Sequence, residues 1–146
     1  MNLSKDAKVT LVQAALTSTA GNDPASDYVH MQGFDGVLFV GSLGTVGSTD
    51  VATLAAWGST STSSTGTAIA SATQTSTAGN SDKFFAIDVY RPTTRYVKTH
   101  LTRSDVVEYG GTVAIQYNAR SKPTTHGTST AVSTGTPAAL VIQQTT

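Results

Sequence analysis

The chain has 146 residues, with 9 basic and 9 acidic side chains, no cysteine and a formal net charge of zero. This length suits a single domain, residues 1–146, which can bury roughly 68–70% of the surface that its unfolded chain exposes. The absence of cysteine excludes a disulfide framework and thiolate sites. A neutral chain has no broad field to attract nucleic acid, so we expect no nucleic-acid partner.

The amino-terminal residues predict neither export nor a membrane anchor. Residues 1–8 alternate polar and apolar side chains and lack the apolar core, about 7–15 residues long, of a secretory signal peptide. Nowhere does the sequence approach the roughly 18 consecutive apolar residues of a membrane-spanning helix. We therefore expect no membrane partner.

Short strand signals separated by turns fill the first 57 residues. Ala7 to Ala15 alternates and predicts a first strand, with Val9, Leu11 and Gln13 on one face. Val37 to Val40 is an apolar run between glycines and predicts a strand buried on both faces. Gly41 to Ser48 is predicted to be a loop. Val51 to Trp57 fits a strand or one helical turn, and we favour a strand because no cap follows it.

Two segments rich in serine and threonine are predicted to be flexible loops or arms. The first is residues 58–81, where the run from Ser59 to Thr65 consists only of hydroxyl residues, with a short edge strand from Ile69 to Thr73 after that run. The second is residues 122–137, after which Ala138 to Gln143 is predicted to pair as a last strand. Such arms can add strands to a neighbour's sheet edge.

Period-two alternation is clearest in three segments, Phe84 to Tyr90, Arg95 to Arg103 and Gly111 to Asn118. Pro92 occupies a favoured turn position and predicts an antiparallel hairpin between the first two segments. Arg91 and Arg95 flank this turn, and we expect them to pair with Asp88 or nearby carbonyls. The predicted core residues are Phe85, Ile87, Val89, Val97, Leu101, Val113 and Ile115.

Seven or eight short strands without a long helical pattern predict an all-β protein. We expect an antiparallel β-sandwich, jelly-roll-like, with extended loops or arms rich in serine and threonine. No repeat of fixed period suggests a solenoid or propeller.

The residues with useful chemistry are few and widely spaced. His30, His100 and His126 have no acidic or histidine neighbours at ligand spacing, and Asp23, Asp27 and Asp35 lack the pattern of a calcium loop. No serine lies in a Gly-x-Ser-x-Gly elbow. We predict that the protein is not an enzyme and has no metal or cofactor.

The segment from Lys83 to Arg103 carries a family resemblance. Its block Asp-Val-Tyr-Arg-Pro-x-x-Arg-Tyr-Val, residues 88–97, resembles small virion proteins of tailed bacteriophages that decorate or cement the capsid. The strand Ala114 to Tyr117, the Lys122-Pro123 pair and the turn from Gly33 to Val37 extend the resemblance over residues 8–125.

This resemblance implies a jelly-roll-like subunit that binds the major capsid protein on the virion surface. It also implies a homo-oligomer, often a trimer, while a tail or head-fibre position stays open. Aromatic and arginine side chains commonly anchor interfaces. Our interface candidates are therefore Arg91, Pro92, Arg95, Tyr96 and Trp57.

A secreted or surface carbohydrate-binding module is the alternative. In that interpretation Trp57, Tyr28 and Tyr109 would form a platform for sugar rings. The expected absence of a signal peptide argues against it. A hydrolase has no residue constellation in its favour.

Overall fold

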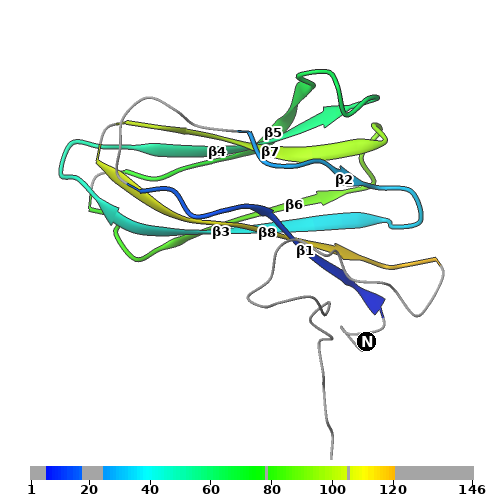
Figure 1. The fold of residues 1–146 in the computed structure, drawn as a ribbon, viewed down its shortest axis with the longest axis horizontal. Helices are drawn as coiled ribbons and strands as arrows, with labels where there is room; N and C mark the ends of the chain where they lie inside the picture. The colour runs from blue at the N-terminus through cyan, green and yellow to red at the C-terminus, as the bar shows by residue number, and fades with distance from the viewer. Residues whose placement is uncertain (1–5, 18–24, 78, 105, 121–146) are drawn as a thin grey trace, which may run out of the picture.

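The computed structural model is an all-β protein of two layers (Figure 1). It describes residues 6–17, 25–77, 79–104 and 106–120, which contain eight strands and no α-helix of more than a single residue. The strands are β1 (Lys8–Gln13), β2 (Val29–His30), β3 (Gly36–Val46), β4 (Ala52–Ser59), β5 (Thr67–Thr75), β6 (Phe84–Tyr90), β7 (Tyr96–Arg103) and β8 (Val107–Tyr117).

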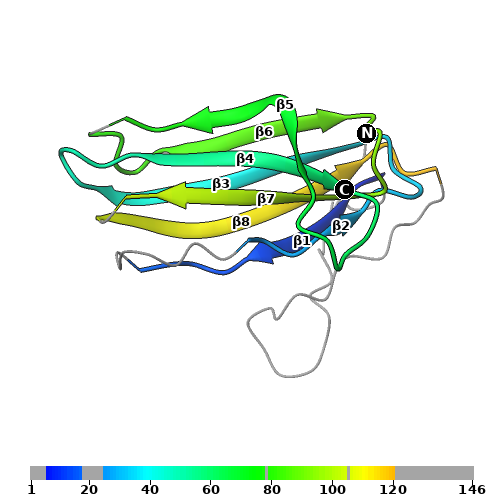
Figure 2. The ribbon, with the colours of Figure 1, turned by 90° about the horizontal axis from the view of Figure 1, so that it is seen from above.

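The strands form two antiparallel sheets of four, in the orders β1-β8-β3-β6 and β2-β7-β4-β5. The first strand pairs with the last, the second with the seventh, and so on inward, which gives the pairs β1·β8, β2·β7, β3·β6 and β4·β5. This is the pairing of one long hairpin that is folded over into two layers. Eight strands in this order make a jelly roll. The prediction of an antiparallel, jelly-roll-like β-sandwich is confirmed, and Figure 2 shows β4 and β7 lying along nearly the same axis with their arrowheads pointing opposite ways.

Several strand boundaries differ from the prediction. The segment predicted as a loop from Gly41 to Ser48 belongs largely to β3, because its backbone continues to pair with β8 as far as Val46. Residues 58–81 are not one long loop, since β4 runs to Ser59 and β5 occupies Thr67–Thr75 at the sheet edge. The short strand β2 was not predicted. Residues 122–137 and the strand predicted from Ala138 to Gln143 lie outside the described residues.

The hairpin predicted around Pro92 is wrong. β6 pairs with β3 in one sheet, whereas β7 pairs with β2 and β4 in the other. The segment from Arg91 to Arg95 therefore crosses between the layers. A proline turn is compatible both with a hairpin inside one sheet and with a crossing from one sheet to the other. Only the pairing of β6 and β7 with distant strands decides between these two arrangements.

The hydrophobic core lies between the two sheets. Five of the seven predicted core residues are buried, with at most 6% of their surface exposed: Phe85, Ile87, Val89, Val97 and Leu101. Their partners include Phe39, Val37 and Leu54, none of which exposes any surface. The alternation of β6 and β7 thus predicted the correct inward faces.

The prediction is wrong for β8, where Val113 and Ile115 are only half-buried while Thr112, Ala114 and Gln116 point inward. β8 has an extra residue relative to β3 between the pairs Gly41↔Thr112 and Leu43↔Tyr109. Gly111 lies at this bulge with a φ of +97°. A bulge moves the alternation to the other face, so the side chains beyond Gly111 reverse their orientation.

The polar side chains that β8 turns inward have hydrogen-bond partners. Gln116 Nε2 donates to the carbonyl of His30 at 2.8 Å, and the hydroxyls of Thr112 and Tyr109 share a short hydrogen bond. Ala114 lies opposite Phe39, where a small side chain leaves room for the ring. These contacts compensate for burying polar groups in the core.

A candidate interaction face on the outer sheet

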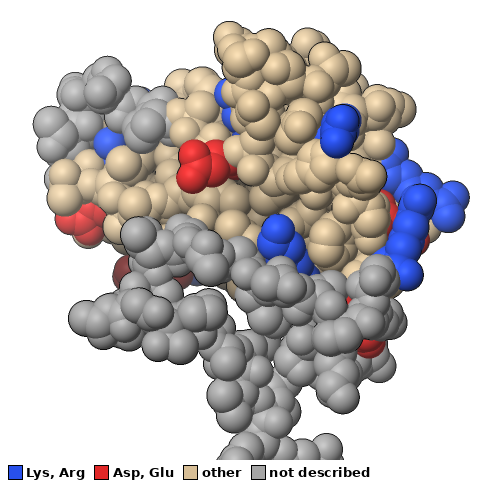
Figure 3. Space-filling view, turned by 45° about the vertical axis from the view of Figure 1, so that its right-hand side comes forward, with Lys and Arg blue, Asp and Glu red and all other residues tan. Residues whose placement is uncertain are grey.

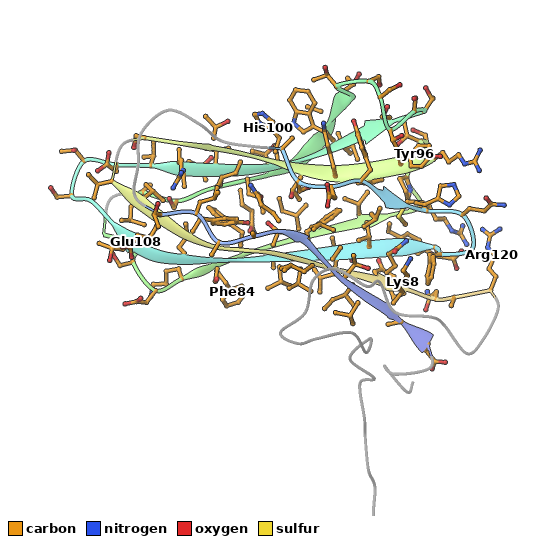
Figure 4. All side chains as sticks on the ribbon, in the orientation of Figure 1. Lys8, Phe84, Tyr96, His100, Glu108 and Arg120 are labelled. Carbon is orange, nitrogen blue, oxygen red and sulfur yellow. The ribbon has the colours of Figure 1, made fainter. Side chains whose placement is uncertain are left out.

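The outer face of the β2-β7-β4-β5 sheet carries a row of aromatic and cationic side chains. Along β7 the inward residues are Val97 and Leu101, as predicted, together with Thr99. Tyr96, Lys98 and His100 alternate with them and point outward, and the pairing of Trp57 with Lys98 adds Trp57 to the same face. Figure 4 shows Tyr96 and His100 on the outer side of this layer. We call Tyr28, His30, Trp57, Tyr96, Lys98 and His100 the aromatic row.

The rings of the aromatic row pack in two groups, one between β4 and β7 and the other between β7 and the segment that contains Tyr28 and β2. Trp57 and His100 have ring centroids 5.1 Å apart and planes inclined by 33°. Tyr96 lies 4.9 Å from the ring of His30 and 6.2 Å from that of Tyr28, the latter edge-on at 70°. Such contacts hold aromatic side chains in fixed positions on an otherwise open sheet face.

Tyr28 joins this row to the serine-rich turn that follows β4. Its hydroxyl donates to the carbonyl of Ser64 at 2.7 Å and lies 3.1 Å from that of Thr65. Its ring covers Lys98, whose Nζ is 4.5 Å from the ring centroid and whose residue is only 7% exposed. The hydroxyl run from Ser59 to Thr65 therefore closes the β4–β5 hairpin under a tyrosine, which the sequence did not indicate.

Arg95 fixes the end of the aromatic row. Its Nε donates to His30 Nε2 at 2.5 Å, its Nη2 donates to Gln32 Oε1 at 3.3 Å, and its guanidinium lies 5.7 Å from the centre of the Tyr96 ring. The expected pairing with Asp88 is not found here, because the carboxylate of Asp88 accepts the Tyr117 hydroxyl on the other sheet at 2.7 Å. Because the chain passes from one sheet to the other at Pro92, Arg95 and Asp88 lie in different layers.

Arg91 and Pro92 lie in the crossing segment beside Tyr96. The guanidinium of Arg91 is 5.1 Å from the centre of the Tyr90 ring, and its backbone N–H donates to the carbonyl of Asp35 at 2.7 Å. Two surface depressions flank this segment, one reaching the serine-rich turn and the other reaching Asp35 and Arg120. All five predicted interface residues thus lie on the outer β2-β7-β4-β5 face or at its border, with Arg91 and Pro92 at the border.

Figure 3 looks onto an edge of the sandwich and shows several lysine and arginine side chains gathered at its right-hand end. Trp57, Tyr28, Tyr96 and His100 are each half-buried, so their rings keep accessible surface. The arrangement offers ring faces and donors to a partner and holds no nucleophile next to a base within the described residues.

Tyr109 does not belong to this face. It is 1% exposed in β8, and burial raises the pKa of its hydroxyl. The sugar platform suggested from Trp57, Tyr28 and Tyr109 therefore cannot include all three. The aromatic row also contains His30, Lys98 and His100, which were not among the interface residues predicted from the sequence. The alternation of β7 does place Lys98 and His100 on the outer side.

His30 makes the stability of this face depend on pH. Desolvation and then the charges of Arg95 and Lys8 lower the pKa of His30 below its usual 6.5. Below pH 6.5 the histidine of the unfolded chain is protonated more readily than His30 in the folded protein. Protonation therefore favours the unfolded state, and the free energy of unfolding decreases as the pH is lowered through this range. We expect the melting temperature to decrease as the pH is lowered from about 7.5 to about 5.5.

Thermal melts of His30→Gln test this expectation. The melting temperature of this variant should decrease less than that of the parent protein over the same pH range, and His100→Gln, which leaves the contact between Arg95 and His30 intact, is the matched control. An unchanged pH dependence in His30→Gln would contradict the assignment.

Neither a metal cluster nor a membrane-spanning helix occurs in the described part of the chain. No group of three histidine, cysteine, aspartate or glutamate side chains is placed there to hold a metal ion. No helix among these residues is long and apolar enough to cross a membrane.

Comparisons with known proteins give only a distant likeness. No protein-family model matches the chain, and no curated protein matches it. Among solved structures it is similar to a chain described by the words "Bacillus endospore appendages form a novel family of disulfide-linked pili", with a TM-score of 0.47 and 18% identity. The alignment covers 79% of this chain and 90% of that one. A likeness at this level carries no functional argument.

Proposed function

We propose that the protein is a non-catalytic structural subunit of a bacteriophage virion, which decorates or cements the capsid by binding the major capsid protein. The observation that carries the proposal is the gathering of Trp57, Tyr96, Tyr28 and Arg95 on one outer sheet face. Tryptophan, tyrosine and arginine are the residue types that dominate binding energy in protein interfaces.

The contacts within the aromatic row support a protein partner. Rings that are already fixed by neighbours lose little conformational freedom on binding, so more of the contact energy remains as affinity. Lys98 and Arg95 supply hydrogen-bond donors beside these rings. The resemblance of residues 88–97 to capsid decoration proteins covers Arg91, Pro92, Arg95 and Tyr96. On this proposal the subunits attach as a homo-oligomer at the capsid surface.

Carbohydrate binding is the second candidate, and the same row supports it. Sugar rings stack on exposed aromatic faces, and Trp57 and Tyr28 are on the same sheet face. Against it, both rings are partly covered by His100 and by the contacts of Tyr28 with Tyr96 and Lys98. A flat open platform is therefore not formed.

Attachment to capsid shells tests the proposal. Candidate coat proteins encoded by genes that neighbour the gene of this chain are assembled into shells, and attachment is measured by co-sedimentation. Trp57→Ala and Tyr96→Ala should each weaken attachment by about 10-fold or more, as expected for residues that contribute over about 1.4 kcal/mol. Phe84→Ala is the matched control, because Phe84 is an aromatic side chain that is 70% exposed on the other sheet.

The outcomes separate the two candidates. Loss of attachment in both variants but not in the control supports the capsid proposal. Unchanged attachment in both variants contradicts it, and a glycan array signal that disappears in Trp57→Ala would favour carbohydrate binding instead. The absence of a coat-protein gene near this chain would also contradict the capsid proposal.

A further inference from the structure

The outer face of the β1-β8-β3-β6 sheet is aliphatic where a solvated sheet face is usually polar. Leu11 pairs with Val113, which pairs with Val40, and in the next row Ile115 pairs with Leu38. These side chains point away from the core residues of the same strands and are half-buried. We call Leu11, Leu38, Val40, Val113 and Ile115 the outer aliphatic face.

Neighbouring β6 extends this surface. Ala86 lies beside Val40, and Phe84, next in line on the same side, is 70% exposed. Figure 4 shows Phe84 pointing away from the sandwich. Contiguous apolar surfaces of this kind mark binding sites in soluble proteins.

The bulge at Gly111 strengthens this interpretation. Without it, Val113 and Ile115 would face the core and Thr112 and Gln116 would face outward. The fold instead buries the polar pair, with hydrogen bonds that satisfy it, and turns the two aliphatic residues outward. Turning aliphatic side chains outward and polar side chains inward lowers the stability of the fold, unless the aliphatic side chains are themselves shielded from water by another segment.

We propose that residues 138–143 of the same chain, Ala-Ala-Leu-Val-Ile-Gln, cover the outer aliphatic face. Residues 138–142 are the longest uninterrupted apolar run in the sequence. Beyond Arg120 the only lysine, arginine, aspartate or glutamate is Lys122, so the segment brings no charged side chain that would lose its water on an aliphatic surface.

The chain leaves β8 at a fixed point beside this face. The N–H of Ala119 donates to the carbonyl of Asp6 at 3.4 Å, and that of Arg120 donates to the carbonyl of Gly33 at 2.9 Å. Arg120 also forms an ion pair with Asp35, with Nη2 and Oδ1 3.3 Å apart. The segment that follows therefore starts near the end of the sheet where Tyr117 packs over Gly36.

The connecting length suits docking within one molecule. Seventeen residues, Ser121 to Pro137, separate Arg120 from the apolar run, and a flexible chain of that length spans about 20–25 Å on average. Val113 precedes Arg120 by seven residues, so the two residues lie no more than about 25 Å apart. A linker long enough to reach the whole face raises the effective concentration of the attached segment, which favours the segment of the same chain over that of another copy.

Paramagnetic broadening tests the proposal directly. The chain has no cysteine, so Gln144→Cys gives a single attachment point for a spin label in the full-length protein. We expect methyl signals of Leu38, Val40, Val113 and Ile115 to lose intensity several-fold. The methyl signals of Thr53 and Thr102, on the outer face of the opposite sheet, should keep theirs. The same label in a Leu140→Asp, Ile142→Asp background should leave all of these signals intact.

A mixed sample identifies the source of the segment. Isotope-labelled protein without the spin label is combined with spin-labelled protein that carries no isotope. Broadening in the single-protein sample and none in the mixture supports docking within one chain. Broadening that also appears in the mixture makes a second copy the occupant and overturns the proposal. It is also overturned if no outer-face methyl broadens, or if the Asp variants broaden as strongly as the parent.

Discussion

Phe39→Ala should lower the free energy of unfolding by about 3–5 kcal/mol. Phe39 is in the centre of β3, exposes no surface, and lies between Ala114 on one neighbouring strand and Ile87 on the other. Removing its ring loses the transfer free energy of the side chain and leaves a cavity that two paired strands cannot close. Since a domain of this kind is stable by only about 5–15 kcal/mol, the loss is a large share of the total.

Urea unfolding followed by tryptophan fluorescence measures the effect, and Phe84→Ala is the matched control. Phe84 belongs to the same sheet but is 70% exposed, so its removal should cost less than about 1 kcal/mol. Equal losses in the two variants would show that the inward and outward faces of this sheet have been assigned incorrectly.

Gly111→Ala should destabilise the protein by roughly 2–4 kcal/mol. Its φ of +97° is unfavourable for any residue with a Cβ, and a Cβ there would lie 2.5 Å from the carbonyl oxygen of Gln13. That neighbour is backbone of the adjacent strand and cannot rotate away. The substitution therefore opposes the bulge that sets the orientation of Val113 and Ile115.

Gly33→Ala separates backbone strain from the clash. Gly33 has a similar φ of +89°, but a Cβ added there would have no neighbouring atom within 4 Å, so the substitution should cost only about 1–2 kcal/mol. Chemical denaturation of both variants gives the comparison. If Gly111→Ala were no more destabilising than Gly33→Ala, the close approach of β1 at the bulge would not be a constraint.

The alternation of β6 and β7 could be interpreted from sequence alone because these strands are regular from end to end. Phe85, Ile87, Val89, Val97 and Leu101 follow a period of two within their strands, and each is buried. Composition and the spacing of turns likewise indicated an all-β sandwich. Period and propensity are local properties, so they survive in a single sequence.

The candidate interface could be predicted only in part. Trp57, Arg95 and Tyr96 were selected as residue types that anchor interfaces, and the structure gathers them on or beside one face. The roles of His30, Lys98 and Tyr28 depend on contacts between strands far apart in the chain, such as the 65 positions between Arg95 and His30. No local pattern reports such pairings.

By itself the sequence determined the all-β fold class and the inward faces of β6 and β7. Only the tertiary structure decided that Pro92 lies at a crossing between sheets, since the partners of β6 and β7 are distant strands. The tertiary structure also decided which side chains of β8 point into the core. Val113 and Ile115 look like core residues in the sequence, but one extra residue at Gly111 reverses every side chain after it.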